Sequence, residues 1–192
     1  MLRIMEWLAR TLAIVGGLVL AALVLLTCIS VIGRGCNTLG HSDFMAEAAP
    51  GLAAMLTRLG PVNGDFELVE AGIAFAIFAF LPICQLHGGH ATVDIFTNQM
   101  PRRLNRFIVV FWEVILTLVL ILICWRLHEG LQSKMSNGET TYLLQFPIWW
   151  AYAASFFASV CAAIVGVYCA AARVASLVTG KHYLPHTEGA MH

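Results

Sequence analysis

The stretch that decides the fold is TLAIVGGLVLAALVLLTCISVI, residues 11–32, which carries no charged side chain over 22 positions. An α-helix rises 1.5 Å per residue, so about 20 apolar residues cross the roughly 30 Å of hydrocarbon in a bilayer. The rest of the chain has a similar composition. Of its 192 residues 59% are hydrophobic and 11% are charged, and the mean hydropathy is +0.80. Soluble domains carry about 25% charged residues, so the sequence predicts an integral membrane protein.

Apolar runs of sufficient length occur four times along the chain. We predict an all-α integral membrane fold with transmembrane helices at about 8–32, 68–86, 107–127 and 151–173. The last apolar run starts earlier, with FPIWWAY at 146–152, whose aromatic residues suit the headgroup level. The first run could be a secretory signal, but it exceeds the 7 to 15 apolar residues usual in one, so we interpret it as a retained helix.

The distribution of positive residues predicts the orientation, because cytoplasmic connections are enriched in lysine and arginine. With a cytoplasmic N-terminus, seven such residues fall inside and four outside. The inside set is Arg3, Arg10, Arg102, Arg103, Arg106, Arg173 and Lys181, and the outside set is Arg34, Arg58, Arg126 and Lys134. We therefore expect both the N- and C-termini to be cytoplasmic.

Two connections have amphipathic patterns that predict interfacial helices. An outer-surface helix is expected at about 46–60, with its leucine and methionine side chains on one side. An inner-surface helix is expected at about 92–106, because apolar residues recur there every three or four positions. Nothing in the sequence suggests a soluble domain or an internal repeat, so the chain is treated as a single membrane domain, 1–192.

The connection 86–107 is interpreted as an anchor. His90 and Asp94 are four residues apart, so they can meet on one helical face and fix the corner after the second transmembrane helix. The three arginines that follow are expected to contact anionic lipid headgroups: Arg102, Arg103 and Arg106.

Three carboxylates near the apolar spans are candidate functional groups. Glu113 lies about 9 Å along the third helix from Phe107. A carboxylate at this depth in the membrane is by default a candidate functional residue. It could carry an ion or a solute, or it could pair with Arg106 on the same face or with a residue of a partner protein. Glu67 and Glu70 stand at the outer end of the second helix, either as a solvated acidic rim or as a docking surface for a periplasmic partner.

A b-type haem is the sharpest alternative, since four-helix membrane bundles can hold one between two histidines. It requires ligands at one depth on two helices. His87 and His90 follow the second helix at its inner end, whereas His41 and His128 lie on the outer side and the others are in the tail. The six cysteines form no CxxC pair and predict neither a zinc site nor a disulfide framework. We predict no cofactor, metal or catalytic residue, no enzyme activity and no nucleic-acid partner.

Small residues recur every four positions on two helices, a spacing that lets helix backbones approach closely in lipid. The fourth helix has two adjacent rows, and the first helix has one. The rows are Ala151, Ser155, Ser159 and Ala163; Ala154, Ala158, Ala162, Gly166 and Ala170; and Ala13, Gly17 and Ala21. Two rows on one helix favour contact with a partner chain, although packing within this chain alone would also explain them.

The order of these features resembles the small membrane subunit of TRAP transporters, the DctQ-like family. An arginine (Arg34) closes the first helix, an acidic residue (Glu67 or Glu70) opens the second, and G-x-H-x-x-V-D spans Gly88 to Asp94. A proline and aromatic residues, 146–152, open the fourth helix. The sequence departs from the family pattern in lacking a basic residue before the glycine, in Ala91 after the histidine and in its long first outer loop.

The resemblance implies a subunit of a three-part, sodium-driven transporter for an organic acid, located in the bacterial inner membrane. Its expected partners are a large membrane subunit, a periplasmic substrate-binding protein and membrane lipids. The substrate and sodium sites are expected on the large subunit. This chain is then expected to be a scaffold that packs against the large subunit and helps dock the binding protein.

Overall fold

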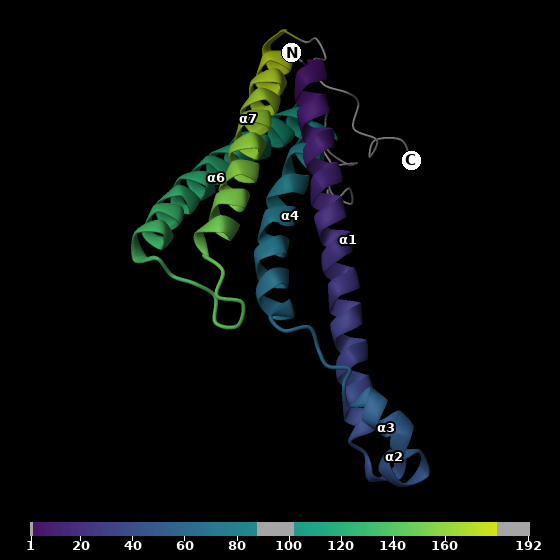
Figure 1. The fold of residues 1–192 in the computed structure, drawn as a ribbon. Helices are drawn as coiled ribbons and strands as arrows, with labels where there is room; N and C mark the ends of the chain where they lie inside the picture. The colour runs from purple at the N-terminus through teal and green to yellow at the C-terminus, as the bar shows by residue number, and fades with distance from the viewer. Residues whose placement is uncertain (1, 88–101, 180–192) are drawn as a thin grey trace.

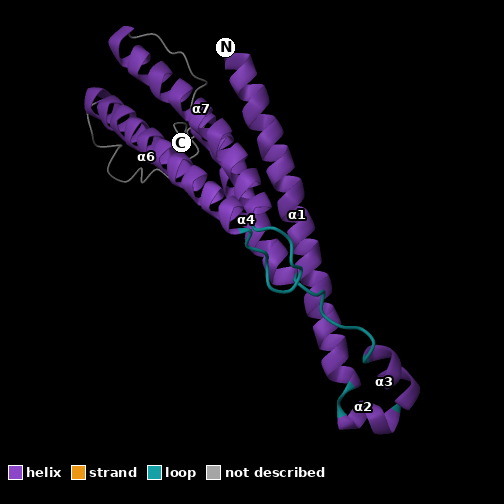
Figure 2. Ribbon diagram, turned by 60° about the vertical axis from the view of Figure 1, so that its left-hand side comes forward, coloured by secondary structure: helices purple, strands orange, loops and turns teal. Residues whose placement is uncertain are grey.

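The computed structural model describes residues 2–87 and 102–179, and these ranges are helical without any strand (Figure 1). Four helices are long and apolar enough to cross a membrane: α1 (Leu2–Gly40), α4 (Asp65–His87), α6 (Arg102–Asn137) and α7 (Trp149–Thr179). This confirms the predicted all-α membrane fold. In Figures 1 and 2, α1 begins and α7 ends at the same end of the bundle, called here the terminal end. The opposite end, with the connection 138–148, is called the loop end.

The first helix is longer than a bilayer crossing needs. Its 39 residues span about 58 Å at 1.5 Å per residue, against roughly 30 Å of hydrocarbon. The hydroxyls of Thr11 and Thr27 donate to the carbonyls of residues four positions earlier, at 2.8 Å in both cases, so their polar atoms are satisfied within the helix. At the loop end α1 continues past the predicted limit at residue 32, and this extension reaches beyond the other long helices (Figure 1).

Beyond α1 the chain forms two short helices in place of the single outer helix expected at 46–60. These are α2 (Asp43–Ala48) and α3 (Pro50–Leu56). The Ser42 side chain caps α2 by accepting a hydrogen bond from a backbone N–H in its first turn. Pro50 has no N–H to continue the preceding helix but is suited to a first helical position, so it separates α2 from α3.

The two short helices are held on the end of α1. Asn37 Nδ2 donates to the Thr57 carbonyl at 2.9 Å. Gly40 lies so close to α3 that a Cβ there would stand 2.8 Å from the backbone nitrogen of Thr57 and 3.0 Å from the carbonyl oxygen of Ala53. In the described chain α3 therefore packs on α1, in addition to its contact with α2.

The α1 and α4 helices cross at close range near the terminal end. A Cβ on Gly16 would lie 2.8 Å from the Ala79 Cβ, so glycine is what allows this approach. Gly16, Leu12 and Ala76 are all buried in the contact. The small residues expected to form the contact row of this helix are half-buried or exposed: Ala13, Gly17 and Ala21.

The fourth long helix, α7, is the central helix of the described chain and contacts α6, α4 and α1. Its buried face combines members of both predicted small-residue rows: Ser155, Ala158, Ser159, Ala162 and Gly166. Members of the two rows are therefore used for contacts within the chain, the second of the two explanations considered from the sequence. Near the terminal end, a buried cluster of Ala9, Leu86, Val165 and Cys169 joins α1, α4 and α7.

Candidate functional site

A buried ion pair joins α6 to α7 near the terminal end. Arg173 Nε lies 3.3 Å from Glu113 Oε2, and the side chains are 17% and 5% exposed. Glu113 is in the second turn of the apolar part of α6, and Arg173 is in the last two turns of α7, so the antiparallel helices bring them to one level. Arg106 or a partner protein was the expected partner of Glu113, and Arg173 was not foreseen. The sequence placed both residues near the predicted inner ends of their spans, but it did not show that these two helices are neighbours.

Further polar groups lie one helical turn from Glu113, beside Gly166 of α7. The Thr117 hydroxyl lies 2.8 Å from the Glu113 carbonyl and 3.3 Å from the carbonyl of Gly166 on α7, and it can donate to either. Gln85 of α4 is 2% exposed and packs directly on the same glycine, where an added Cβ would meet its Oε1 at 2.8 Å. Three helices therefore share one polar layer, which sequence reasoning did not find.

A second polar group, at the loop end, ties α1 to the start of α4. Ser30 donates a hydrogen bond to Asp65, and the backbone N–H of Val62 donates to Ser30 Oγ at 3.3 Å. Arg34 Nη2 lies 3.9 Å from the same Asp65 carboxylate. Arg34 was expected to close the first helix, but α1 continues to Gly40 and Arg34 faces the N-terminus of α4 instead. Asp65 also suits that helix end, because a carboxylate there interacts favourably with the helix dipole.

Glu67 fixes the connection 138–148 to α4. Its two carboxylate oxygens accept hydrogen bonds from the backbone N–H groups of Leu143 at 2.6 Å and Leu144 at 3.0 Å. Gly64 lies against Leu144 with a φ of 75° and no room for a Cβ. The connection therefore packs directly on the entry to α4, and the Glu67 carboxylate has specific partners beyond those of a solvated acidic rim.

The same connection is also braced internally. Thr141 N donates to Phe146 O at 3.0 Å, and Gln145 closes this turn with a φ of 54°. Lys134 at the end of α6 donates to Glu139, and together with the Asn137 amide it holds the pKa of the Glu139 carboxyl below its usual range. These contacts give the loop end a defined shape.

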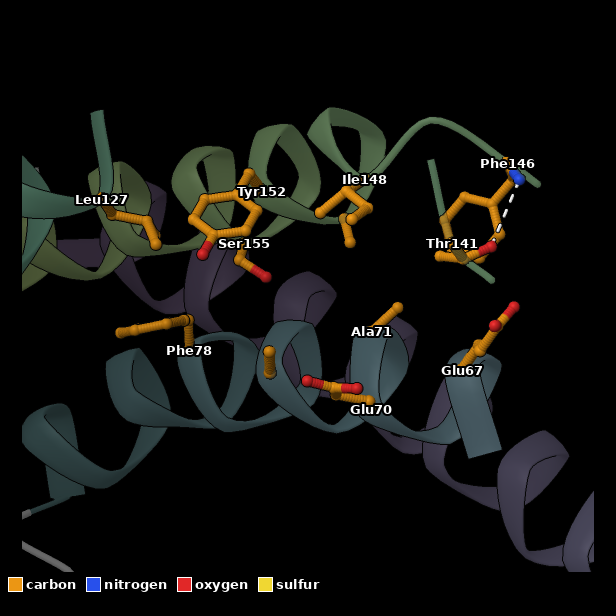
Figure 3. Close-up of a pocket in the computed structure, with 12 residues that line it drawn as sticks. Glu67, Glu70, Ala71, Phe78, Leu127, Thr141, Phe146, Ile148, Tyr152 and Ser155 are labelled. Carbon is orange, nitrogen blue, oxygen red and sulfur yellow. Dashed lines mark hydrogen bonds between the residues drawn. The ribbon is translucent and has the colours of Figure 1, made fainter. Parts of the chain in front are cut away.

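A pocket of about 310 Å³ opens between α4, α7, the end of α6 and this connection. Figure 3 shows Glu70 on α4 across from Ser155 and Tyr152 on α7, which project toward α4. Glu67 and Thr141 stand near one end of the pocket, and Phe78 and Leu127 near the other. Sequence reasoning named the two glutamates but had no means of finding the α7 wall.

Several predicted site residues lie in or beside parts of the chain that the structure does not describe. His90 and Asp94 fall within residues 88–101, as does most of the expected inner-surface helix. Arg102, Arg103 and Arg106 are in the first two turns of α6, which begins at Arg102. Their positions on the helix are known, while the contact with lipid headgroups stays a prediction.

A match to a protein-family model identifies the family of the chain. A family model described as "Tripartite ATP-independent periplasmic transporters, DctQ component" matches residues 48–177, which is more than half of the chain. The chain belongs to this family. Its members are the small membrane subunits of TRAP transporters and work with a large membrane subunit and a substrate-binding protein. No curated protein and no solved structure matches the chain.

Membership of the DctQ family agrees with the fold. With four apolar helices, the chain is a multi-pass protein of the bacterial inner membrane. The family match begins at the end of α2, so it covers α3, α4, α6 and most of α7 and leaves α1 outside. The Glu113 ion pair, which joins α6 to α7, and the Glu67 contacts, which join α4 to the connection 138–148, both lie within the matched region.

Proposed function

We propose that this DctQ protein is the scaffold subunit of a sodium-driven TRAP transporter for an organic acid. It packs against the large membrane subunit and helps dock the periplasmic binding protein. The family match is the observation that carries the proposal. The substrate class and the sodium dependence are inferred from the resemblance of the sequence to the family.

The distribution of charge supports a scaffold more than a carrier. A carrier needs an accessible polar group in the membrane, but Glu113 is 5% exposed and paired with Arg173. The centres of α1, α4 and α7 contain no charged residue. A haem is not favoured by the described histidines either, because His87 is at the terminal end while His41 and His128 are toward the loop end.

The remaining surface suits a large hydrophobic partner. The buried share of the most apolar part is 11% for α1 and 17% for both α4 and α6, against 44% for α7. Large aromatic side chains on these helices are exposed: Trp7, Trp112 and Trp125. We assign the contact with the large subunit to α1 and α6, with lipid covering what that subunit leaves free.

We further propose that the loop end faces the periplasm. The excess of positive residues on the opposite side supports this orientation. The loop end then presents α2, α3 and the connection 138–148, of which α2 and α3 expose Phe44 (79%) and Met55 (65%). These elements would form this chain's share of the docking surface for the binding protein.

Co-purification tests the scaffold role. The tagged chain is extracted in mild detergent from its native membrane, and bound proteins are identified and quantified by mass spectrometry. We expect a large polytopic subunit in near-equal amount. Uptake of an organic acid into vesicles with the assembled complex and binding protein should fall when the sodium gradient is collapsed. Recovery of this chain alone, stable and monodisperse, would contradict the proposal and return attention to Glu113 as a carrier group.

A further inference from the structure

The pocket at the loop end has a gradient of polarity along its length. Its lining on α4 runs from Glu67 to Phe78, a rise of about 16 Å along the helix. This is close to half of the roughly 30 Å hydrocarbon core, the depth of one leaflet. Carboxylates and Thr141 line the end nearest the loop, and the rings and aliphatic chains of Phe78 and Leu127 line the deep end (Figure 3). The pocket is therefore shaped for an amphiphile aligned with lipid.

Two polar groups face this space without a partner in the described chain. Ser155 is 3% exposed, and its buried hydroxyl makes no hydrogen bond although it lines the pocket. A buried hydroxyl without a hydrogen-bond partner destabilises the fold, so a bound acceptor would offset that cost. Glu70 lies opposite, and no hydrogen bond or ion pair engages its carboxylate within the residues described.

The wall opposite α4 is held in place by close packing. A Cβ on Gly130 of α6 would lie 2.9 Å from the ring carbon Cε1 of Tyr152, so the glycine allows the tyrosine ring to pack against α6. Ala71 and Ala74 line the pocket from α4, and their small side chains leave space between α4 and α7. A volume of about 310 Å³ is at the lower end of the range for ligand pockets.

We propose that this pocket binds a phospholipid with a primary ammonium headgroup, phosphatidylethanolamine. The ammonium donates a charge-assisted hydrogen bond to Glu70, and the Ser155 hydroxyl donates to a phosphate or ester oxygen of the lipid. The upper part of one acyl chain follows the alanine face of α4 toward Phe78. An ammonium fits because Glu70 offers negative charge and no arginine or lysine lines the pocket to attract an anionic headgroup.

A lipid fits these observations better than a side chain of another protein. A basic side chain would satisfy Glu70 but would leave the apolar depth beside Phe78 unfilled. A phospholipid matches both the polar end and the apolar end, and it is present wherever the chain is inserted. The proposal concerns a ligand and does not depend on the transport role.

The test compares the lipids kept by variants of the full-length chain. Each variant is reconstituted in nanodiscs with equal phosphatidylethanolamine and phosphatidylglycerol, then released and examined by native mass spectrometry. The wild type should retain phosphatidylethanolamine preferentially. Glu70→Gln should lower that preference by about fivefold, since it removes one charge-assisted contact. Ala74→Phe, which fills the pocket, should lower retention of both lipids. Glu47→Gln on α2, an exposed carboxylate outside the pocket, is the matched control.

Equal retention of the two lipids by the wild type would overturn the proposal, as would a Glu70→Gln variant identical to Glu47→Gln. If Glu70→Gln loses the large subunit on co-purification but keeps the wild-type lipid profile, the pocket receives a basic side chain and the lipid proposal is wrong. Gln is nearly isosteric with Glu at this exposed position, so the variant remains testable even if Ala74→Phe fails to fold.

Discussion

At the scale of single residues, the described carboxylates near the ends of the spans differ in how they are satisfied. Glu113 pairs with Arg173 inside the bundle, Asp65 accepts from Ser30, and Glu67 accepts two backbone N–H groups. Each of these contacts joins two different segments of the chain. Glu113 is buried, where an ionised carboxylate is costly unless it is paired, whereas the partly exposed Asp65 and Glu67 are held by specific hydrogen bonds. The three carboxylates specify which helices and loops meet.

The ion pair between α6 and α7 gives the first prediction. Glu113→Gln keeps the shape of the side chain but leaves the Arg173 guanidinium, 17% exposed, without its charge partner. Removing one member of a buried pair is strongly destabilising, and we expect a cost of roughly 2–4 kcal/mol at this position near the end of α7. The midpoint of thermal unfolding in detergent, followed by size-exclusion chromatography of heated samples, should fall clearly.

Another pair on α6 supplies the control for this measurement. Arg126 and Glu129 form an ion pair at 2.9 Å, but their side chains are 76% and 47% exposed. Exposed pairs contribute little to stability, so Glu129→Gln should leave the unfolding midpoint nearly unchanged. Equal midpoints for Glu113→Gln and the wild type would show that the buried pair does not stabilise the contact between α6 and α7.

At the scale of the helices, the long apolar elements follow from composition because lipid requires an apolar side chain almost everywhere along a span. Composition does not determine which faces of two neighbouring helices contact each other. Gly17 and Gly16 differ by one residue, which rotates the side-chain direction by about 100° around the helix. The sequence pattern selected the row containing Gly17, whereas the crossing with Ala79 uses Gly16. The residues four positions from Gly16 are Leu12 and Leu20, so this row lacks the small-residue spacing and only the position of α4 identifies it as the contact face.

The helix ends were also difficult to predict. Hydropathy marks where a helix leaves the hydrocarbon, but helical hydrogen bonds remain satisfied in water, and α1 continues to Gly40. The break at Pro50 was available from sequence, because proline cannot continue a helix from its preceding turn. The partner of Glu113 required knowing that α6 and α7 are neighbours, and the α7 wall of the pocket required the same information.

The crossing of α1 and α4 carries the second prediction. Gly16→Val would place side-chain atoms against Ala79, where an ideal Cβ already lies 2.8 Å from the neighbouring Cβ. We expect a cost of about 1–3 kcal/mol, the usual range for overpacking, and a lower unfolding midpoint. Gly35→Val on the same helix, where an added Cβ meets nothing within 4 Å, is the matched control. Similar behaviour of the two variants would show that close approach at Gly16 is not needed.

At the scale of the whole molecule, the helix that is most buried within the chain differs from the helices that expose most apolar surface. α7 is the most buried long helix, and α1 and α6 are covered by exposed apolar side chains. The family match covers residues 48–177, which include α3, α4, α6 and most of α7. α1 extends past the other long helices and holds α2 and α3 at its far end (Figure 2). The chain thus combines a bundle, in which α4 packs between α1 and α7 and α7 packs on α6, with an extension of α1 that reaches beyond it.

The proposed orientation gives the last prediction, because it determines which end meets the binding protein. With the loop end in the periplasm, Gly51→Cys on α3 should react with a membrane-impermeant maleimide in intact spheroplasts. Gly51 is exposed, and an added Cβ there meets nothing within 4 Å. Glu6→Cys near the start of α1 should react only after the membrane is permeabilised. Cys28 and Cys36, which lie on the half of α1 toward the loop end, are first replaced by serine to remove background labelling.

Labelling of Glu6→Cys but not Gly51→Cys in intact spheroplasts would reverse the orientation and exclude α2 and α3 from the docking surface. The excess of arginine and lysine at the terminal end predicts the opposite result.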